Sequence, residues 1–546
     1  MRRFPPVHGD RLVSGGSGQV AYNKGRETSA DRKPVVKILL VSSEVVPFAK
    51  TGGLADVCNA LPAALQKLGH EVVVCLPGYR ATRLAGQPIE ATGVELPVSL
   101  NGQPVRGRWT TTVLPDSGVP VWLVEQEDLF GRDGLYQDEN GDFADNCRRF
   151  SFFCRFVLEL LAHQSWYPDI LHCNDWQTGL IPAHLATRLA DVDGYRHITT
   201  LMTIHNLAYQ GNFPADQFCW TGMDTRFFNW RQMEFHEHLN LLKTGIVFAD
   251  LVSTVSPAYA REIQTEPFGC GLQNVLQERQ DRLFGVLNGI DTDAWNPQTD
   301  AALHRNYGVD DWQEGKAACK QWLQEQAGLT PDPDVPVIGL VGRLAAQKGW
   351  SLIMPVMQRW LAEHPVQWIV LGKGEPEIEQ GLDRLQQAHP GRLVVHIGFS
   401  DSLARQIEAA SDIFLMPSRY EPCGLNQQYS MRYGAVPVVH RTGGLADTVV
   451  DADPHNLDQQ TANGFVFDNF EAEQLNTAVR RAVLTWLHDR QRWQQLVNTG
   501  MQTDWSWQRS ANQYVRLYQR AKQQARASGP GPDDQHSGDP TARPLE

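Results

Sequence analysis

The chain has 546 residues, 42% of them hydrophobic and 20% charged, and its 62 acidic and 49 basic side chains give a net charge of -13. This composition is typical of a soluble globular protein, and the length predicts more than one domain. The acidic excess and the lack of a basic run argue against a nucleic-acid groove or a polybasic membrane patch, because both need concentrated Lys and Arg. We therefore expect neither nucleic acid nor a membrane as a partner.

Nine cysteines are spread along the sequence, and they form no CxxC pair. An odd number without paired spacing predicts neither a disulfide framework nor a zinc site. We expect reduced thiols and a cytoplasmic protein.

Both ends of the sequence are poor in large apolar residues. Residues 1–34 contain no apolar stretch long enough for a signal sequence or a membrane span. Residues 528–546 contain too few apolar side chains to offset the entropy of ordering them. We expect a disordered lead-in over 1–34 and a disordered tail over 528–546.

Between the ends, short apolar runs typical of buried strands alternate with longer amphipathic segments. This alternation predicts βαβ units, and hence an α/β fold with two doubly wound parallel sheets. In the first half the expected strands are 36–44, 71–77, 119–125, 169–173, 199–205 and 250–256. In the second half they are 335–342, 366–372, 392–398, 412–418 and 436–441. Turn residues between the two sets predict a hinge at 286–297.

One motif occurs twice, as KTGGLADV at 50–57 and as RTGGLADT at 441–448. Each copy follows an expected strand, and apolar residues recur at helical spacing after the first copy. Glycine lets a ligand approach the backbone, and the N–H groups of a helix start favour an anion. A Gly-Gly pair can instead serve only as a tight strand-to-helix turn. Two copies on opposed sheets favour a ligand site, because ligands bind beyond the carboxyl ends of such strands.

Two cations, Arg343 and Lys348, lie five positions apart in VGRLAAQKG, after the first strand of the second half. The planar fork of Arg and the point charge of Lys suit a diphosphate, and would stabilise charge on a departing nucleotide. A solvated basic loop could have the same spacing. The P-loop pattern GxxxxGK[ST] does not occur in the sequence, so phosphoryl transfer by that route is unsupported.

An acidic residue, Glu421, follows the expected strand 412–418 in the motif PSRYEPCGL. Such a loop can present one carboxylate and several backbone N–H groups, and Glu421 could accept hydrogen bonds from sugar hydroxyls. A lone Glu is more often a surface acid. Cys423 is expected to be a small buried residue whose thiol has no chemical role.

Polar residues also end two strands of the first half, in HCNDWQTGL and TIHNLAYQG. The candidates are His172, Asp175, His205 and Asn206. The spacing of His172 and Asp175 does not make a metal site without a third ligand, so we expect no metal. Asp175 and His205 are better suited to orient the hydroxyls of a polar substrate, although His205 could be structural.

Seven motifs together resemble the bacterial glycogen synthase and plant starch synthase family, over about Val35 to Ala525: KTGGLADV, HCNDWQTGL, TIHNLAYQG, VLNGID, VGRLAAQKG, PSRYEPCGL and RTGGLADT. The resemblance implies a GT-B fold, with two Rossmann-like doubly wound parallel-sheet domains facing across a cleft. It implies a hexosyltransferase that moves glucose from ADP-glucose to the non-reducing end of an α-1,4-glucan such as glycogen. Retention of configuration and the lack of any metal or other cofactor are part of this expectation.

The resemblance also divides the chain. It implies an acceptor-side domain over 35–290 and a nucleotide-sugar-binding domain over 291–503. A helix over 504–527 is expected to cross back to the first domain.

Site residues follow from the resemblance, motif by motif. The implied catalytic residues are His205, Arg343, Lys348 and Glu421. The implied donor-binding residues are Lys50, Gly52, Gly53, Asp56, Asn206, Phe399, Cys423, Gly424, Leu425, Thr442 and Gly443. Tyr136 and Asp175 are implied to line the sugar and acceptor side of the cleft. No carboxylate stands out as a covalent nucleophile, so front-face attack by the acceptor is the simplest hypothesis, and a covalent route stays open.

Two positions depart from the family pattern. Phe399 stands where some bacterial relatives have Tyr near the adenine, and Asn426 follows PCGL where the family varies. One alternative is another retaining GT-B transferase that uses a UDP- or GDP-sugar. Many of these have a second acid eight positions after the first, whereas Tyr429 stands there in this chain. The other alternative is a non-catalytic glucan-binding homologue, although pure binding needs no clamp for a leaving group.

Overall fold

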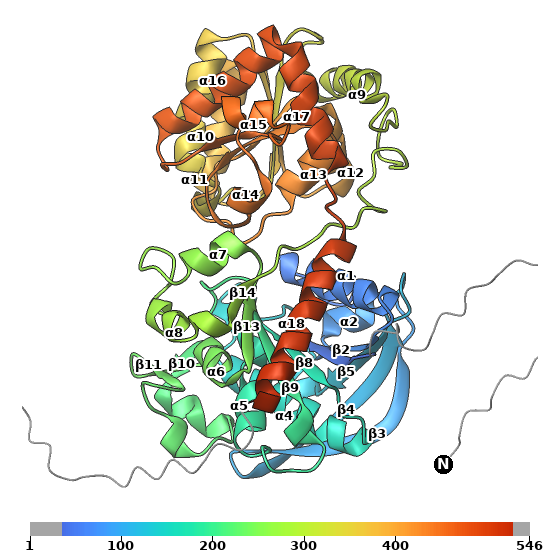
Figure 1. Ribbon diagram of the computed structural model, residues 1–546, viewed down its shortest axis with the longest axis vertical. Helices are drawn as coiled ribbons and strands as arrows, with labels where there is room; N and C mark the ends of the chain where they lie inside the picture. The colour runs from blue at the N-terminus through green and yellow to red at the C-terminus, as the bar shows by residue number, and fades with distance from the viewer. Residues whose placement is uncertain (1–34, 528–546) are drawn as a thin grey trace, which may run out of the picture. The chain divides into compact units, whose positions relative to one another are not determined.

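The computed structural model describes residues 35–527, and the expectations for 1–34 and 528–546 lie outside this range. Its first sheet has the strand order β14-β13-β9-β8-β1-β2-β5-β4-β3 (Figure 1). The strands are β1 (Lys37–Val41), β2 (Glu71–Pro77), β3 (Glu90–Leu100), β4 (Gln103–Val113), β5 (Pro120–Glu125), β8 (Ile170–Asn174), β9 (Thr199–Ile204), β13 (Leu251–Thr254) and β14 (Leu283–Gly285). Each strand expected in the first half is present: β2 has the expected bounds, β8 is shifted by one residue, and the others are shortened at one or both ends.

One edge of this sheet differs from the expected parallel arrangement. Strands β3 and β4 pair antiparallel with each other, and β4 pairs antiparallel with β5. Asn101 and Gly102 join β3 to β4 with φ values of 47° and 75°. An Asn-Gly pair favours such positive φ values, so it turns the chain back directly instead of leading into a crossover helix. The sheet is therefore mixed, with a hairpin at its edge.

The second sheet has the strand order β17-β16-β15-β18-β19-β20, and its neighbouring strands are parallel. The strands are β15 (Val337–Val341), β16 (Gln367–Gly372), β17 (Leu393–Ile397), β18 (Ile413–Met416), β19 (Val436–His440) and β20 (Phe465–Phe467). The expected strands of the second half are confirmed, and β20 was not anticipated. The fold class, two doubly wound α/β sheets, is thus the one expected.

Helices cover the sheets as amphipathic segments whose apolar residues face the two main cores. The helices before the second sheet are α1 (Gly53–Lys67), α2 (Arg80–Leu84), α3 (Glu127–Phe130), α4 (Asn146–Gln164), α5 (Leu180–Ala186), α6 (Leu241–Phe248), α7 (Pro257–Glu262), α8 (Gln273–Glu278) and α9 (Trp312–Ala327). Those that follow are α10 (Trp350–Glu363), α11 (Pro376–Ala388), α12 (Asp401–Ala410), α13 (Asn426–Arg432), α14 (Gly443–Thr448), α15 (Pro454–Asp458), α16 (Ala472–His488), α17 (Arg490–Gln502) and α18 (Trp507–Ala527). Short strands complete the structure: β6 (Gln137–Asp138), β7 (Gly141–Asp142), β10 (Asn212–Pro214), β11 (Glu234–Phe235) and β12 (His238–Asn240).

The last helix, α18, packs against α1 and β9, far from its neighbours in sequence (Figure 1). Its Tyr518 hydroxyl lies 2.9 Å from Nδ1 of His172 on β8, and Nε2 of the same imidazole lies 2.6 Å from the Thr203 hydroxyl. Both ring nitrogens of His172 are therefore used inside the protein. Within residues 35–527, none of the helices is both long and apolar enough to cross a membrane.

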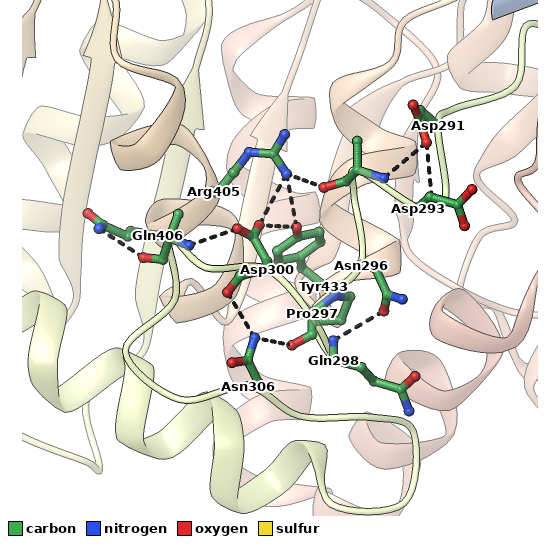
Figure 2. A network of polar contacts seen from close by, with 12 residues as sticks. Asp291, Asp293, Asn296, Pro297, Gln298, Asp300, Asn306, Arg405, Gln406 and Tyr433 are labelled. Carbon is green, nitrogen blue, oxygen red and sulfur yellow. Dashed lines mark hydrogen bonds and ion pairs between the residues drawn. The ribbon is translucent and has the colours of Figure 1, made fainter. Parts of the chain in front are cut away.

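The segment expected to act as a hinge is partly fixed to the second sheet's helices (Figure 2). The Asp300 carboxylate accepts hydrogen bonds from the Tyr433 hydroxyl at 2.5 Å and from the Arg405 guanidinium at 3.1 Å. Trp295 stacks on Tyr429 with ring centroids 3.7 Å apart. The carbonyl of Ala294 also accepts a hydrogen bond from the Arg405 guanidinium, so the end of the 286–297 segment is tied to α12 and α13. The Asn288 carbonyl near its beginning accepts from the Gln428 side chain of α13. The domain boundaries at 290 and 503 stay predictions.

Candidate active site

Strand β1 marks the point where the connections of the first sheet change direction, because β1 lies between β2 and β8. Ligands in doubly wound folds bind beyond the carboxyl ends of the strands at such a switch point. The loop after β1 contains Glu44 and the KTGG turn, and β8 ends at Asn174 and is followed by Asp175. The KTGG turn and Asp175 thus lie at the same sheet edge.

Glu44 is the central residue of this edge, although no sequence motif singles it out. Its side chain is buried, and Oε2 accepts hydrogen bonds from the backbone N–H groups of Thr51 at 2.5 Å and Gly52 at 3.2 Å. Oε1 accepts from the Thr51 hydroxyl at 2.6 Å and the Tyr136 hydroxyl at 2.8 Å. One carboxylate therefore joins the turn before α1 to a tyrosine of the predicted sugar side.

Asp175 and His205, which follow the ends of β8 and β9, lie together as expected. The Asp175 carboxylate accepts from the His205 backbone N–H at 2.7 Å. Burial raises the pKa of Asp175 to about 7, and the nearby Glu44 carboxylate also raises it. Asp175 has a φ of 56°, a left-handed conformation that is uncommon outside glycine and recurs at functional sites.

The His205 imidazole is neutral at physiological pH, because burial lowers its pKa to about 3. Its Nε2 lies 2.8 Å from Oδ1 of Asn174, whose amide nitrogen donates to the carbonyls of Val41 and His172. Since these bonds fix the orientation of the amide, Nε2 must be the donor. Nδ1 is then an acceptor, suited to a substrate hydroxyl.

The second sheet has its own switch point at β15, which lies between β16 and β18. Arg343 and Lys348 follow β15, and Ser418 and Glu421 follow β18. A pocket at this edge is lined mostly by apolar residues of β15, β16, β18 and α10, and its polar lining residues include Arg343, Lys348, Ser418 and Asn426. Arg343 and Lys348 therefore lie at the same sheet edge as Glu421, although more than seventy positions separate them from it in the sequence.

Lys348 and Glu421 form a direct ion pair, with Nζ 2.5 Å from Oε2. The Ser418 hydroxyl donates to the same oxygen at 3.0 Å. Glu421 is buried and the Lys348 side chain is 25% exposed, so the pair opens to solvent on the lysine side. Arg343 is exposed, and its guanidinium donates to the Gln347 side chain at 3.1 Å. An exposed Arg beside a half-buried Lys can reach a polyanionic ligand.

The two TGGLAD copies use their glycines differently. In the second copy, a Cβ on Gly443 or Gly444 would lie 2.0 or 1.9 Å from the carbonyl oxygen of Glu421 or Cys423. Packing against that loop therefore requires glycine. In the first copy, a Cβ on Gly52 or Gly53 would meet no atom within 4 Å among the described residues. Protein packing does not explain the first pair, which leaves room for a ligand at the backbone.

The N–H groups of the second copy already have acceptors in the protein. The Gly443 N–H donates to the Glu262 carboxylate of α7 at 2.8 Å, and the Thr442 hydroxyl lies 3.3 Å from the same group. The Gly444 N–H donates to the Glu421 carbonyl. The expectation of open N–H groups at this helix start is therefore wrong for α14, whose start packs against α7 and the 421–424 loop.

The other predicted site residues are placed as follows. Lys50 forms an ion pair with Asp56 at 2.8 Å. Burial raises the pKa of the Cys423 thiol to about 12, which fits the expectation of no chemistry there. Gly424 has a φ of 72°, and Leu425 is the N-cap of α13. The Asn206 side chain accepts a hydrogen bond from the Ala208 N–H, and the Asn426 amide donates one to the Val341 carbonyl. Phe399 is 82% exposed.

One candidate lies outside the site, and two residues that were not candidates support it. His172, considered for the site, is fully buried against Tyr518 and Thr203 and does not reach it. Asn174 is hydrogen-bonded to His205, 31 positions away, and Ser418 to Glu421, 3 positions away. Asn and Ser are common residue types, so neither residue stands out in the sequence. Over residues 35–527, no cluster of three or more His, Cys, Asp or Glu has the arrangement of a metal site.

Comparisons with known proteins agree on one family. Residues 37–278 match the family described as starch synthase catalytic domain, and residues 324–500 match glycosyl transferases group 1. A glycogen synthase of Rhodopirellula baltica is 48% identical, covering 89% of this chain and 98% of that protein. Glycogen synthase 2 of Geobacter sulfurreducens is 46% identical, covering 89% and 99%. The catalytic domain of starch synthase IV from Arabidopsis thaliana, solved with ADP and acarbose bound, has a TM-score of 0.81 at 33% identity, covering 90% of this chain and 100% of that one.

Proposed function

The chain belongs to the glycogen and starch synthase family of glycosyltransferases, and from this premise we propose that it transfers glucose from ADP-glucose to an α-1,4-glucan. The proposed acceptor is the 4-hydroxyl at the non-reducing end, and configuration at the anomeric carbon is retained. The observation that carries the proposal is the shared position of Arg343, Lys348 and Glu421 at the switch point of the second sheet.

The two cations stabilise the leaving group. As the bond from the anomeric carbon to the donor phosphate breaks, its electron pair moves to ADP. Arg343 and Lys348 are fixed positive groups where this charge grows, and such preorganised groups are among the largest contributions to catalysis. In front-face attack, the acceptor oxygen bonds to the anomeric carbon on the side from which ADP leaves. The proton of that hydroxyl passes to the departing phosphate oxygen.

The two sheet edges hold the sugar by hydrogen bonds. On the second sheet, the Glu421 carboxylate has acceptor capacity beyond its bonds to Lys348 and Ser418. On the first sheet, the neutral His205 imidazole offers Nδ1 as an acceptor, and Asp175 is mainly protonated below about pH 7 and can donate. Such groups direct hydroxyls and make no covalent bond to the sugar.

The proposal includes a reaction that needs no metal and a protein that works in the cytoplasm. The cations already present supply the charge that a metal would supply to a diphosphate. All nine cysteines are free thiols in the structure, and seven of them are buried, which suits a reducing compartment.

Product analysis tests the proposal. The enzyme is incubated with ¹³C-labelled ADP-glucose and a maltooligosaccharide in excess EDTA, and the new linkage is examined by NMR. We expect an α-configured anomeric signal and a label that an exo-acting glucosidase releases first from the non-reducing end. A β-linkage, a label at the reducing end, or activity that EDTA abolishes and Mg²⁺ restores would contradict it.

A further inference from the structure

Glu44 has an unusual environment for an acidic residue. It is 4% exposed, and over the described residues no ion pair involves it. Its charge is balanced by four donors, namely two backbone N–H groups and two hydroxyls. Hydrogen bonds to a charged group are about twice as strong as neutral ones, and a buried carboxylate is retained only where such donors compensate it.

The donors of these bonds belong to two separate parts of the predicted site. Thr51 and Gly52 form the turn that positions Lys50 and Gly53 at the start of α1. Tyr136 comes from a loop more than eighty positions later, and its hydroxyl also lies 2.7 Å from the Ser43 hydroxyl. The Glu44 carboxylate is the group to which both parts are bonded.

We propose that Glu44 is a positioning residue for glucosyl transfer, because its carboxylate fixes the Thr51-Gly52 turn and the Tyr136 ring in the relative arrangement that receives the donor. This inference rests on the proposed function. It also changes the role expected of Gly52, whose N–H is committed to Glu44 rather than to a phosphate. The donor is then met by Gly53 onward and by the Lys50 side chain.

Glu44 also acts electrostatically on Asp175. Burial is the main reason that the pKa of Asp175 is raised, and the negative charge of Glu44 adds to it. Among the described residues, Cys58 on α1 and Tyr259 on α7 also interact electrostatically with Asp175, whereas His205 contacts it through its backbone N–H. Of these groups, Glu44 alone is a carboxylate. Removing its charge should therefore move the Asp175 ionisation to lower pH.

The test compares Glu44→Gln with Glu95→Gln, a half-exposed acid of β3 that serves as a matched control. An amide keeps the size of Glu44 but has one oxygen instead of two, so it cannot accept all four bonds. We expect kcat to fall at least tenfold and the KM for ADP-glucose to rise. The KM for glucan should change little, and Glu95→Gln should match the wild type in activity and melting temperature.

Two further readouts separate positioning from a general structural role. The pH profile of kcat/KM should move to lower pH in Glu44→Gln. Hydrogen exchange of the Thr51 and Gly52 amides should become at least tenfold faster, with exchange in the two sheets unchanged. Should Glu44→Gln fold poorly, Thr51→Val and Tyr136→Phe remove single bonds from the other side. Each is expected to lower kcat severalfold.

The outcomes distinguish this inference from the function it rests on. A wild-type enzyme without ADP-glucose-dependent transfer would overturn the proposed function, whereas the amide exchange measurement would still test the role of Glu44. An active wild type with Glu44→Gln within threefold of it, or with unchanged amide exchange, would overturn the positioning role. The positioning role would also be overturned if all variants lost activity only in proportion to the loss of folded protein.

Discussion

Lys348 Nζ lies 2.5 Å from Oε2 of Glu421, so the predicted leaving-group cation and the predicted sugar acid form one ion pair. The two residues are 73 positions apart and come from loops after neighbouring strands, β15 and β18. Removing either partner leaves the other without its counter-charge in a partly buried place, which changes more than one interaction at once.

The first prediction concerns this pair. Lys348→Ala and Glu421→Ala should each lower kcat by roughly a hundredfold or more, as loss of a preorganised charged group does. Because each change also disables the partner, the double variant should lose clearly less than the product of the single effects. Steady-state kinetics of the three variants measure the coupling. Strictly multiplicative losses would show that the two side chains act independently.

The second prediction uses the two TGGLAD copies as mutual controls. Gly444→Ala should destabilise the protein strongly, since its Cβ would lie 1.9 Å from a backbone carbonyl. Gly53→Ala meets open space among the described residues, so the melting temperature should hold while the KM for ADP-glucose rises about tenfold or more. Thermal unfolding and donor titration test both. The opposite pattern, a stable Gly444→Ala and a donor-insensitive Gly53→Ala, would remove the ligand role of the first copy.

A third prediction follows from the raised pKa of Asp175. The folded protein keeps this carboxyl protonated up to about pH 7, whereas in the unfolded chain it ionises near its ordinary value of 3.8. Between about pH 4 and pH 7 the folded state therefore binds one proton more than the unfolded state at this carboxyl. The stabilising contribution of Asp175 is present in full below about pH 4 and is lost as the pH rises to 7. Asp175→Asn should abolish that loss.

The measurement is urea unfolding of the wild type and Asp175→Asn at pH 5 and pH 8. The free energy of unfolding of the variant minus that of the wild type should be larger at pH 8 than at pH 5. His205, His172 and His184, whose pKa values burial lowers to about 3, give the opposite slope in both proteins and cancel in the difference. An exposed control, Asp191→Asn, should show no such gain. A pH-independent difference for Asp175→Asn would contradict the raised pKa.

The fourth prediction concerns the contact of α18 with the first sheet. Tyr518→Phe removes the hydroxyl that lies 2.9 Å from Nδ1 of His172, and leaves a buried nitrogen without a partner. We expect a loss of about 1 to 3 kcal/mol in unfolding free energy. Tyr79→Phe is the matched control, because the buried Tyr79 hydroxyl has no hydrogen-bond partner among residues 35–527. Equal losses in both variants would argue against the bond.

Much of the fold could be predicted because buried parallel strands are continuous apolar runs, as in Lys37–Val41 and Val337–Val341. The β3-β4 hairpin was missed although Asn101-Gly102 signals one, since its strands alternate apolar and polar residues and look unlike the others. The short β20 has three residues, too few for a pattern.

The candidate site was predictable only where residue types are distinctive. Arg343, Lys348 and the glycine motifs stand out, but their exact partners do not. Glu44 is a single acid after a strand, and only the fold shows that Thr51, Gly52 and Tyr136 converge on it. The two TGGLAD copies are nearly identical in sequence, so their different surroundings could not be read from the motif.

The most direct test of the proposed reaction is the incorporation of labelled glucose into glycogen from ADP-glucose and UDP-glucose, measured side by side with purified wild-type enzyme. We predict that kcat/KM with ADP-glucose is at least tenfold higher, and that incorporation needs the glucan primer. Equal or higher efficiency with UDP-glucose, or no incorporation from either donor, would contradict the proposed reaction.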